Sequence, residues 1–132
     1  DNASMLTMLD PSAGEEGVID AVVRAVEAKA SGACPPLIVG VGVGGTFDGV
    51  GKLAKKALLR PLDERTAGRQ HRAFEDRLLE AGNATGIGPA GLGGTTTALG
   101  VRVLTAPCHI AALPVAVNLG CSAMRSITVE VA

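Results

Sequence analysis

The chain has 132 residues, a formal net charge of −1 and only two aromatic residues, both phenylalanine. This length suits one domain that buries a core. With 12 basic against 13 acidic residues there is no basic stripe, and almost no ring could stack on bases, so nucleic-acid binding is not expected. Glycine, proline and polar residues interrupt the apolar stretches well short of a membrane span, and no signal peptide is recognisable.

Three cysteines, Cys34, Cys108 and Cys121, are widely spaced and odd in number. This pattern is not typical of a secreted disulfide framework. An isolated cysteine is more often a small buried hydrophobe than a ligand. Cys34, however, precedes two prolines at a predicted strand entrance, and Cys121 follows a predicted strand and a glycine. Both positions are loop edges, which favours ligation, and we expect a cytoplasmic, reducing compartment.

The first predicted helix follows a segment without clear signals. Residues 1–10 show no evident cap or turn, whereas Ser12 and Glu15 have the spacing of a capping box. Apolar residues then recur at helical spacing and predict one buried face, with Gly32 as a suitable stop. That face consists of Val18, Ala21, Val22, Ala25 and Val26.

A continuous apolar run, rich in β-branched residues, occupies residues 36–43 (PLIVGVGV). Such a run is typical of a strand buried on both faces, as in a parallel sheet. A glycine-rich loop follows it. A helix is then expected from about Gly49 to Arg60, where Pro61 would end it.

The second half of the chain predicts one more helix and three strands. Residues 61–68 are polar and indicate a loop, and residues 69–81 carry apolar side chains at helical spacing. His71 stands among charged residues there and is expected to face solvent. We therefore expect one α/β domain with a mostly parallel central sheet flanked by helices, or a fragment of a larger such domain. The strands are predicted at residues 98–104, 113–119 and, alternating as an edge strand does, 127–131.

Polar groups that could do chemistry gather in two segments, residues 34–56 and 85–125. Each holds a loop rich in glycine, apolar strands and at least one cysteine. Functional residues commonly lie on loops carried by a rigid sheet. We therefore expect the two segments to converge on one site.

Residues 40–45 (GVGVGG) match the G-x-G-x-x-G pattern of dinucleotide-binding folds between a strand and a helix. That fingerprint also expects a second strand ending in an acid about twenty residues later. A helix end and Pro61 stand there instead, so a dinucleotide-binding module remains an alternative. A Walker loop is excluded because Leu53 follows Lys52, where serine or threonine is required.

A zinc site made of Cys34, Cys108, His109 and Cys121 has suitable ligand types. Structural zinc sites, however, favour closely spaced cysteine pairs, and none is present. The adjacent Cys108 and His109 would also have difficulty binding one ion. Zinc is therefore not favoured.

Several long motifs occur in the order found in one enzyme family. They are residues 34–46 (CPPLIVGVGVGGT), 52–60 (KLAKKALLR), 86–89 (GIGP), 91–94 (GLGG) and 107–118 (PCHIAALPVAVN). Together they resemble the α subunit of class I, iron–sulfur fumarate hydratase and of its relative L(+)-tartrate dehydratase. The resemblance covers nearly the whole chain, so residues 1–132 are identified as the C-terminal part of such an α domain.

The resemblance implies a [4Fe-4S] cluster held by three cysteines, with one iron open to the substrate. Cys34 and Cys121 match two of the family's ligands. The remaining ligand belongs to a Cys-x-Asp-Thr-Gly segment that would precede residue 1, so it is expected from outside residues 1–132. Cys108 stands where the family has no ligand.

The resemblance also implies substrate-binding residues. His109 matches a histidine next to the substrate, and a pKa near neutrality suits acid–base work. Thr46 and Thr95 stand in glycine loops whose amides could bind carboxylates. Arg125 is expected either close to the cluster or as a cap of the local turn.

By this resemblance, the chain is part of a hydro-lyase acting on a four-carbon dicarboxylate: fumarate and malate, or tartrate and oxaloacetate. A β subunit or β domain supplies the remaining substrate groups, so the chain alone is expected to be inactive, and an oligomer is expected. Two alternatives stay open. One is the dinucleotide module at residues 40–45, and the other is an interaction domain without catalysis.

Overall fold

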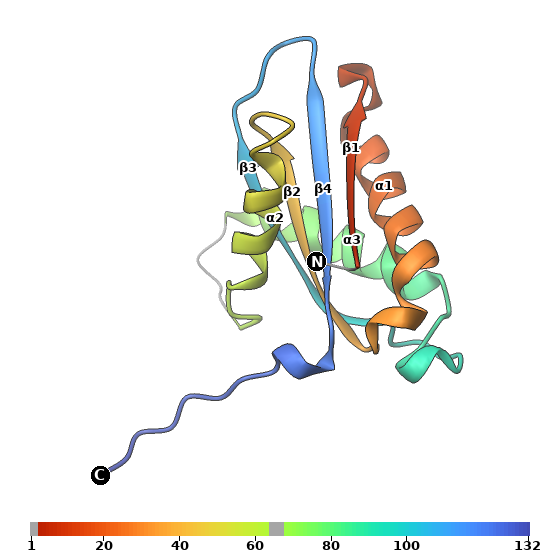
Figure 1. Cartoon of the computed structure of the whole chain (residues 1–132), viewed down its shortest axis with the longest axis vertical. Coiled ribbons are helices and arrows are strands. Elements are labelled where there is room, and N and C mark those ends of the chain that lie inside the picture. The colour runs from red at the N-terminus through yellow and green to blue at the C-terminus, as the bar shows by residue number, and fades with distance from the viewer. Residues whose placement is uncertain (1–2, 64–67) are drawn as a thin grey trace.

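The computed structural model describes residues 3–63 and 68–132. Within them, a four-stranded sheet with strand order β1-β4-β2-β3 has helices on both faces (Figure 1). The expected single α/β domain is confirmed. The strands are β1 (Ser4–Leu9), β2 (Leu37–Gly44), β3 (Ala98–Ala106) and β4 (Leu113–Gly120), and the helices are α1 (Gly14–Lys29), α2 (Val50–Leu58) and α3 (Arg69–Ala84).

The sheet is mixed, not mostly parallel as predicted. Only β2 and β3 pair in parallel, whereas β4 runs antiparallel to both β2 and β1. The apolar runs of β2 and β4 reflect burial on both faces, which covering helices provide whichever way a strand runs. Only residues 107–112 connect β3 to β4, too few for a crossover to a parallel strand.

The first two elements depart from the sequence signals. β1 has the sequence SMLTML, without the Val- and Ile-rich run that predicted the other strands. The expected capping box does not form, because the Asp10 carboxylate accepts hydrogen bonds from the Ser12 amide and hydroxyl (2.8 and 2.5 Å). Helix α1 then starts without a side-chain cap and ends at Lys29, before Gly32. Its predicted buried face is confirmed.

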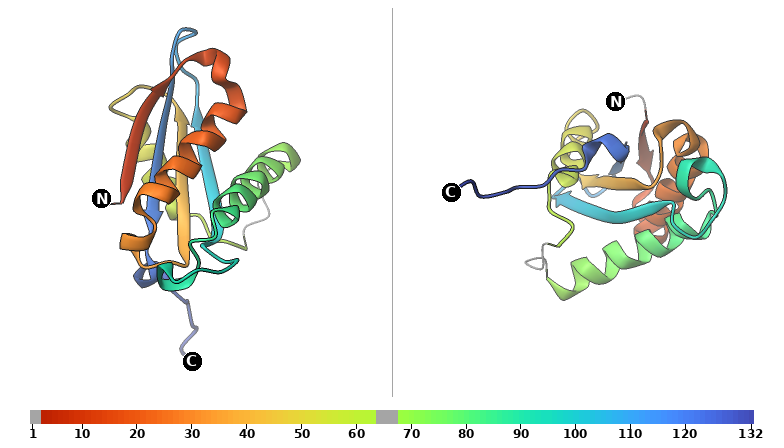
Figure 2. Two further views of the ribbon diagram at one scale, coloured as in Figure 1. Left: turned by 90° about the vertical axis from the view of Figure 1, so that its right-hand side faces the viewer. Right: turned by 90° about the horizontal axis from the view of Figure 1, so that it is seen from below.

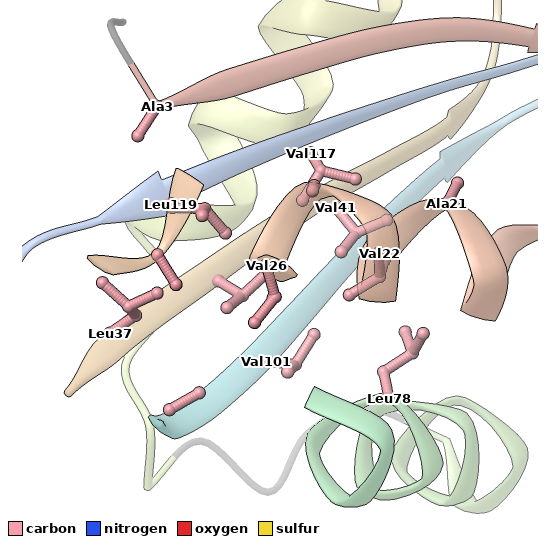
Figure 3. Packing of buried hydrophobic residues seen from close by; sticks show 14 of the residues in the cluster. Ala3, Ala21, Val22, Val26, Leu37, Val41, Leu78, Val101, Val117 and Leu119 are labelled. Carbon is pink, nitrogen blue, oxygen red and sulfur yellow. The ribbon is translucent and has the colours of Figure 1, made fainter. Parts of the chain in front are cut away.

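The two faces of the sheet are covered differently. Helices α1 and α3 lie on one face and α2 lies on the other (Figure 2). Full burial of each valine or leucine stabilises the fold by roughly 1.5–3 kcal/mol, so the larger face carries most of the stability. Its cluster includes Val22, Val26, Val41, Leu78 and Val101 (Figure 3).

Helix α2 approaches β2 closely because Gly40 and Gly42 have no side chain. A Cβ atom at Gly40 would lie 2.3 Å from the Ala54 carbonyl oxygen, and one at Gly42 would lie 2.5 Å from the Val50 carbonyl oxygen. These distances are well below van der Waals contact. The two glycines therefore let the helix pack on the strand.

Helix α3 starts where predicted and continues to Ala84. His71, expected to face solvent, is half-buried instead, with its Nε2 atom 2.9 Å from the Val103 carbonyl oxygen. The reason is that α3 lies along the outer edge of β3, where backbone groups lack a strand partner. Residues 64–67, within the predicted polar loop, lie outside the described residues.

The strand predicted at residues 127–131 is wrong. These residues are exposed and form no strand, and they lead away from the domain (Figure 1). Among the described residues, none of the four strands of the sheet pairs with this alternating segment. Among the described residues, none of the helices combines the length and the apolar character that a membrane crossing needs.

Candidate functional site

Cys34 and Cys121 lie on adjoining loops at one end of the sheet, which we call the cysteine end. Cys34 stands shortly before β2, and Cys121 directly follows β4. Because these strands are antiparallel, with Ile38 opposite Gly120, the start of β2 meets the end of β4. The Ser122 amide donates a hydrogen bond to the Cys34 carbonyl oxygen (3.3 Å). Sheet register thus brings the two cysteines together.

The donor set at this end fits an iron–sulfur cluster in part. Cys34 is exposed, Cys121 is half-buried and both thiols are free. Thiolates are the usual protein ligands of iron–sulfur clusters. Across residues 3–63 and 68–132, no group of three histidine, cysteine or acidic side chains could hold a metal ion. The two cysteines expected as ligands therefore lie at this end, and no third side chain of these types joins them among the described residues.

Arg125 ties the two cysteine loops together. It follows the short 3-10 turn at Ser122–Met124, and its guanidinium donates to the Ser122 carbonyl (3.3 Å) and to the Pro36 carbonyl (2.7 Å). One side chain therefore spans the loop of Cys121 and the loop of Cys34. Of the two expectations for Arg125, the bond to the Ser122 carbonyl is that of a cap of the local turn.

A glycine-rich loop, residues 86–97, completes the cysteine end. The Ala90 amide donates to the Pro35 carbonyl (2.9 Å), which places this loop beside Cys34. The buried Thr97 accepts from the Gly88 amide (3.0 Å), and Asn83 accepts from the amides of Thr97 and Ala98 (both 2.8 Å). Thr95 in the same loop is exposed.

Sequence reasoning missed Asn83 and Thr97, the two side chains that shape this loop. An asparagine in the last turn of a helix, just before a glycine-rich stretch, is a weak signal. Its side-chain oxygen can accept backbone amides that the loop leaves unpaired. In the sequence, nothing distinguished Thr97 from Thr95 and Thr96 beside it.

Thr46 and His109 lie at the opposite end of the sheet, which we call the turn end. Gly44, the last residue of β2, pairs with Ala106, the last of β3, and the turn containing His109 follows. His109 is exposed, and its Nδ1 atom accepts from the Ala111 amide (3.1 Å). Cys108, beside it, donates from Sγ to the Ala112 carbonyl (3.1 Å).

Thr46 starts the turn into α2. Its carbonyl accepts from the amides of Gly49 (3.1 Å) and Val50 (2.9 Å). A hydrogen bond from the Thr46 side chain lowers the pKa of Asp48, an acid that sequence reasoning did not single out. Thr46 is exposed and serves this turn through its own local contacts.

The predicted site residues therefore fall into two groups. Cys34, Cys121, Thr95 and Arg125 lie at the cysteine end, and Thr46, Cys108 and His109 lie at the turn end. The eight residues of β2 separate the ends by roughly 25 Å, at about 3.3 Å per residue. The loops converge only within each end, so one chain cannot gather a zinc site from Cys34, Cys108, His109 and Cys121.

Helix packing accounts for the first two glycines of the G-x-G-x-x-G match at residues 40–45. Its first two glycines lie inside β2 and are buried against α2, as their Cβ distances show. In a dinucleotide fold the first of these glycines allows the tight turn after the strand, and the second lets pyrophosphate approach the backbone. In this chain their space is taken by the helix.

Comparisons with known proteins agree with the sequence motifs. The family model described as fumarate hydratase (Fumerase) matches residues 1–130. The "Putative L(+)-tartrate dehydratase subunit alpha" of Methanocaldococcus jannaschii is 46% identical over 125 residues, which are 95% of this chain and 44% of that protein. The L(+)-tartrate dehydratase subunit alpha of Escherichia coli strain K12 is 40% identical over 124 residues, 94% of this chain and 41% of that protein.

The chain thus spans less than half the length of these curated relatives. The match to the family model nevertheless extends over almost every residue of the chain, and the two relatives align along more than nine-tenths of it. The chain belongs to the fumarate hydratase (Fumerase) family.

Proposed function

We propose that the chain forms the C-terminal part of the α portion of a [4Fe-4S]-dependent hydro-lyase. The reaction is the addition or removal of water on a four-carbon dicarboxylate, with fumarate and malate or tartrate and oxaloacetate as the substrate pairs. Family membership supports the reaction class, and the names of the relatives support the tartrate pair. The observation that carries the proposal is the meeting of two free cysteines at one sheet end.

Cys34 and Cys121 are the proposed cluster ligands, with the third ligand from outside the described residues. When bound through three cysteines, such a cluster supplies one open iron that acts as a Lewis acid toward a hydroxyl group. The chain's own contribution is to position the two thiols. The β2–β4 pairing and the Arg125 bridge hold the two thiols at a fixed separation, so the ligands need little reorganisation.

The loop of residues 86–97 is the proposed carboxylate-binding element at the same end. Gly91, Gly93 and Gly94 all have positive φ, and their amides donate to the carbonyls of Gly88, Ile87 and Gly86 inside the loop. These bonds fix the shape of the loop, and the exposed Thr95 side chain is the group proposed to meet the carboxylate. With Thr95→Ala in the assembled enzyme, KM for the dicarboxylate is expected to rise while the cluster stays intact. An unchanged KM would remove Thr95 from the site.

His109 and Thr46 are proposed to act on substrate in trans. Both lie at the turn end, so neither reaches a cluster held by Cys34 and Cys121 of the same chain. A role beside the substrate therefore places them at the cluster of another copy in the oligomer.

Hybrid oligomers test this assignment. His109→Ala and Cys34→Ser enzymes should each be inactive, and their mixture should regain activity, because one hybrid site keeps both native residues. Mixing without any recovery, while oligomers demonstrably exchange, would place His109 in another role.

A β subunit or β domain is proposed to complete the active site. The chain alone is then inactive, and measurable hydration of fumarate by the purified chain would contradict that requirement. We further propose a cytoplasmic location, because the free and exposed thiols of Cys34 and Cys108 suit a reducing compartment.

Anaerobic reconstitution with iron and sulfide tests the cluster. The chain has no Trp or Tyr, so the absorbance of the protein itself is small. Absorbance at about 400 nm then reports cluster formation. Cys34→Ser and Cys121→Ser should each lose most of the signal. The matched control is Cys108→Ser at the turn end, which should keep it. Equal loss in all three variants would contradict the assignment of Cys34 and Cys121. If the unmodified chain forms no cluster, the same comparison of variants is made in the full-length assembly, which supplies the third ligand.

A further inference from the structure

Two residues at the cysteine end hold strained backbone conformations. Among the described residues, Cys34 and Ala90 are the two non-glycine residues with positive φ, both at 55°. This left-handed region is disfavoured for any residue that carries a Cβ atom. Such a conformation persists where the surrounding structure over-determines the backbone, and it is found most often at functional sites. The bonds that hold these two residues therefore bear on what the site does.

One hydrogen bond joins the two strained segments. The Ala90 amide donates to the carbonyl of Pro35, the residue after Cys34 (2.9 Å). The carbonyl before that of Pro35 accepts from the Ser122 amide (3.3 Å), and the carbonyl after it accepts from the Arg125 guanidinium (2.7 Å). Three consecutive carbonyls thus accept bonds from different residues. Pro35 is buried and Cys34 is exposed, so an anchored backbone presents the cysteine at the surface of the domain.

Thr97 holds the turn that contains Ala90. The Thr97 side chain is fully buried, and its hydroxyl oxygen accepts from the amide of Gly88, directly before that turn (3.0 Å). The Thr97 carbonyl accepts from the amide of Leu37, the first residue of β2 (2.8 Å). One threonine therefore joins the turn of Ala90 to the strand that follows the cysteine loop.

Asn83 holds Thr97 in turn. Its side-chain oxygen accepts from the amides of Thr97 and Ala98 (both 2.8 Å), at the point where β3 begins. Asn83 stands in the last turn of α3, and α3 is itself fixed to β3, because the Glu75 carboxylate accepts from the Val103 amide (2.9 Å). A continuous series of bonds thus runs from a helix packed on the sheet, through Asn83 and Thr97, to the loop beside the cysteine.

We propose that Asn83 and Thr97 are positioning residues for the Cys34 ligand. They hold the loop of residues 86–97 against Pro35, and this contact keeps Cys34 in its left-handed conformation. Because rotation about φ carries the Cβ atom with it, the conformation sets the direction of the thiol. The inference rests on the proposed cluster function, and it adds two supporting side chains to the two ligands.

Nuclear magnetic resonance of the chain without cluster tests the geometry. Backbone chemical shifts of Cys34 should report the left-handed conformation, and the Ala90 amide should be protected from hydrogen exchange. Thr97→Val keeps the size and the β-branch but removes the acceptor, so the Ala90 amide should exchange about tenfold faster or more. The Cys34 shifts should move toward those of an extended residue.

Conservative variants separate the hydrogen bonds from the packing around them. Asn83→Leu removes the acceptor at similar size and should act as Thr97→Val does. Thr97→Ser and Asn83→Asp each keep an acceptor oxygen, so both should retain the Cys34 shifts and the protection of the Ala90 amide. Asn83 is only half-buried, so its variants allow the same comparison if Thr97→Val does not fold.

The lifetime of the cluster in the full-length assembly tests the link to the ligand. Thr97→Val should shorten the half-life of the cluster in the presence of an iron chelator by about tenfold, and Thr97→Ser should restore it. The control is Val22→Ala. Val22 is fully buried on α1, outside the loop, so its truncation lowers the stability of the fold and should leave the half-life unchanged.

Three results would overturn the positioning role. They are Cys34 shifts in the unmodified chain that do not report a left-handed residue, shifts and Ala90 exchange that Thr97→Val leaves unchanged, and a half-life that falls equally in Thr97→Val and Val22→Ala. Failure of the proposed function gives a different result, because Cys34→Ser would then keep the cluster. If Cys34→Ser loses the cluster and Thr97→Val keeps its half-life, the positioning role alone is wrong.

Discussion

The two ends of the sheet are built in different ways. At the cysteine end, three loops are held by bonds between distant segments: Ala90 to Pro35, Ser122 to Cys34, and Arg125 to Pro36. At the turn end, each turn is held by its own neighbours, as in the bonds of His109 with Ala111 and Ala112. The cysteine end therefore depends on the whole sheet, whereas the turn end is self-contained.

This difference suits the proposed roles. A cluster needs ligands whose separation is fixed, and long-range bonds on a sheet fix it. A residue that serves another copy of the chain needs exposure, and His109 is exposed on a short turn. Substitutions that remove bonds at the cysteine end should therefore lower the stability of the fold more than substitutions at the turn end.

The largest loss of stability is expected from a substitution that disturbs the packing of α2 on β2, because both ends of the sheet depend on this contact. Gly42→Ala should destabilise the fold by roughly 1–3 kcal/mol or more, because the new Cβ would stand 2.5 Å from the Val50 carbonyl oxygen. Chemical unfolding measures the change. Gly32→Ala is the control, since no atom lies within 4 Å of its Cβ position, and it should be nearly neutral.

A smaller effect is expected from Arg125→Ala at the cysteine end. Loss of its bonds to Ser122 and Pro36 should lower Tm by roughly 2–5 °C. The reconstituted cluster should also be lost faster. The comparison at the turn end is His109→Ala, whose bonds are local, and its Tm should match that of the unmodified chain. If Arg125 instead only binds substrate, Arg125→Ala would leave Tm unchanged and raise KM.

The smallest effect concerns the pKa of Asp48 at the turn end. The Thr46 side chain lowers this pKa below its ordinary value of 3.8, so Thr46→Ala should raise it. Because the folded pKa is depressed, its contribution to stability is present above the ordinary value and is lost as pH falls through the folded value. Carboxyl titration by NMR measures the shift.

A matched site stands elsewhere in the chain. The Ser12 side chain likewise lowers the pKa of Asp10, so Ser12→Ala should raise the pKa of Asp10 and leave that of Asp48 unchanged. Carboxyl titrations in which neither variant moves its own acid would show that these hydrogen bonds do not persist in solution.

Much of the fold follows from burial patterns in the sequence. The apolar runs predicted β2 and β4, and helical spacing predicted the buried face of α1, because both patterns report burial directly. Strand direction could not be obtained in that way, since a run buried on both faces reads alike in either direction. Residues 127–131 alternate as a strand does, but pairing depends on a neighbouring strand, and none of the described strands pairs with them.

One feature of the sequence could have predicted that the candidate site residues lie at two different ends of the sheet. The connection at residues 107–112 is too short to return the chain to the opposite end of the sheet. It therefore leaves His109 at one end, and an eight-residue strand carries Cys121 to the other. The proximity of Cys121 to Cys34 could not be predicted from the sequence. It depends on which strands are neighbours in the sheet, and the order of the motifs along the chain does not show this.

Thiol cross-linking tests the central claim most directly. In the Cys108→Ser chain, a short bismaleimide should bridge Cys34 and Cys121 within one molecule, which mass spectrometry detects as a cyclised product. In the Cys121→Ser chain, the same reagent should not bridge Cys34 and Cys108, because the sheet separates them. If the second pair is bridged as readily as the first, Cys34 and Cys121 do not share one end of the sheet apart from Cys108, and the proposed cluster site is wrong.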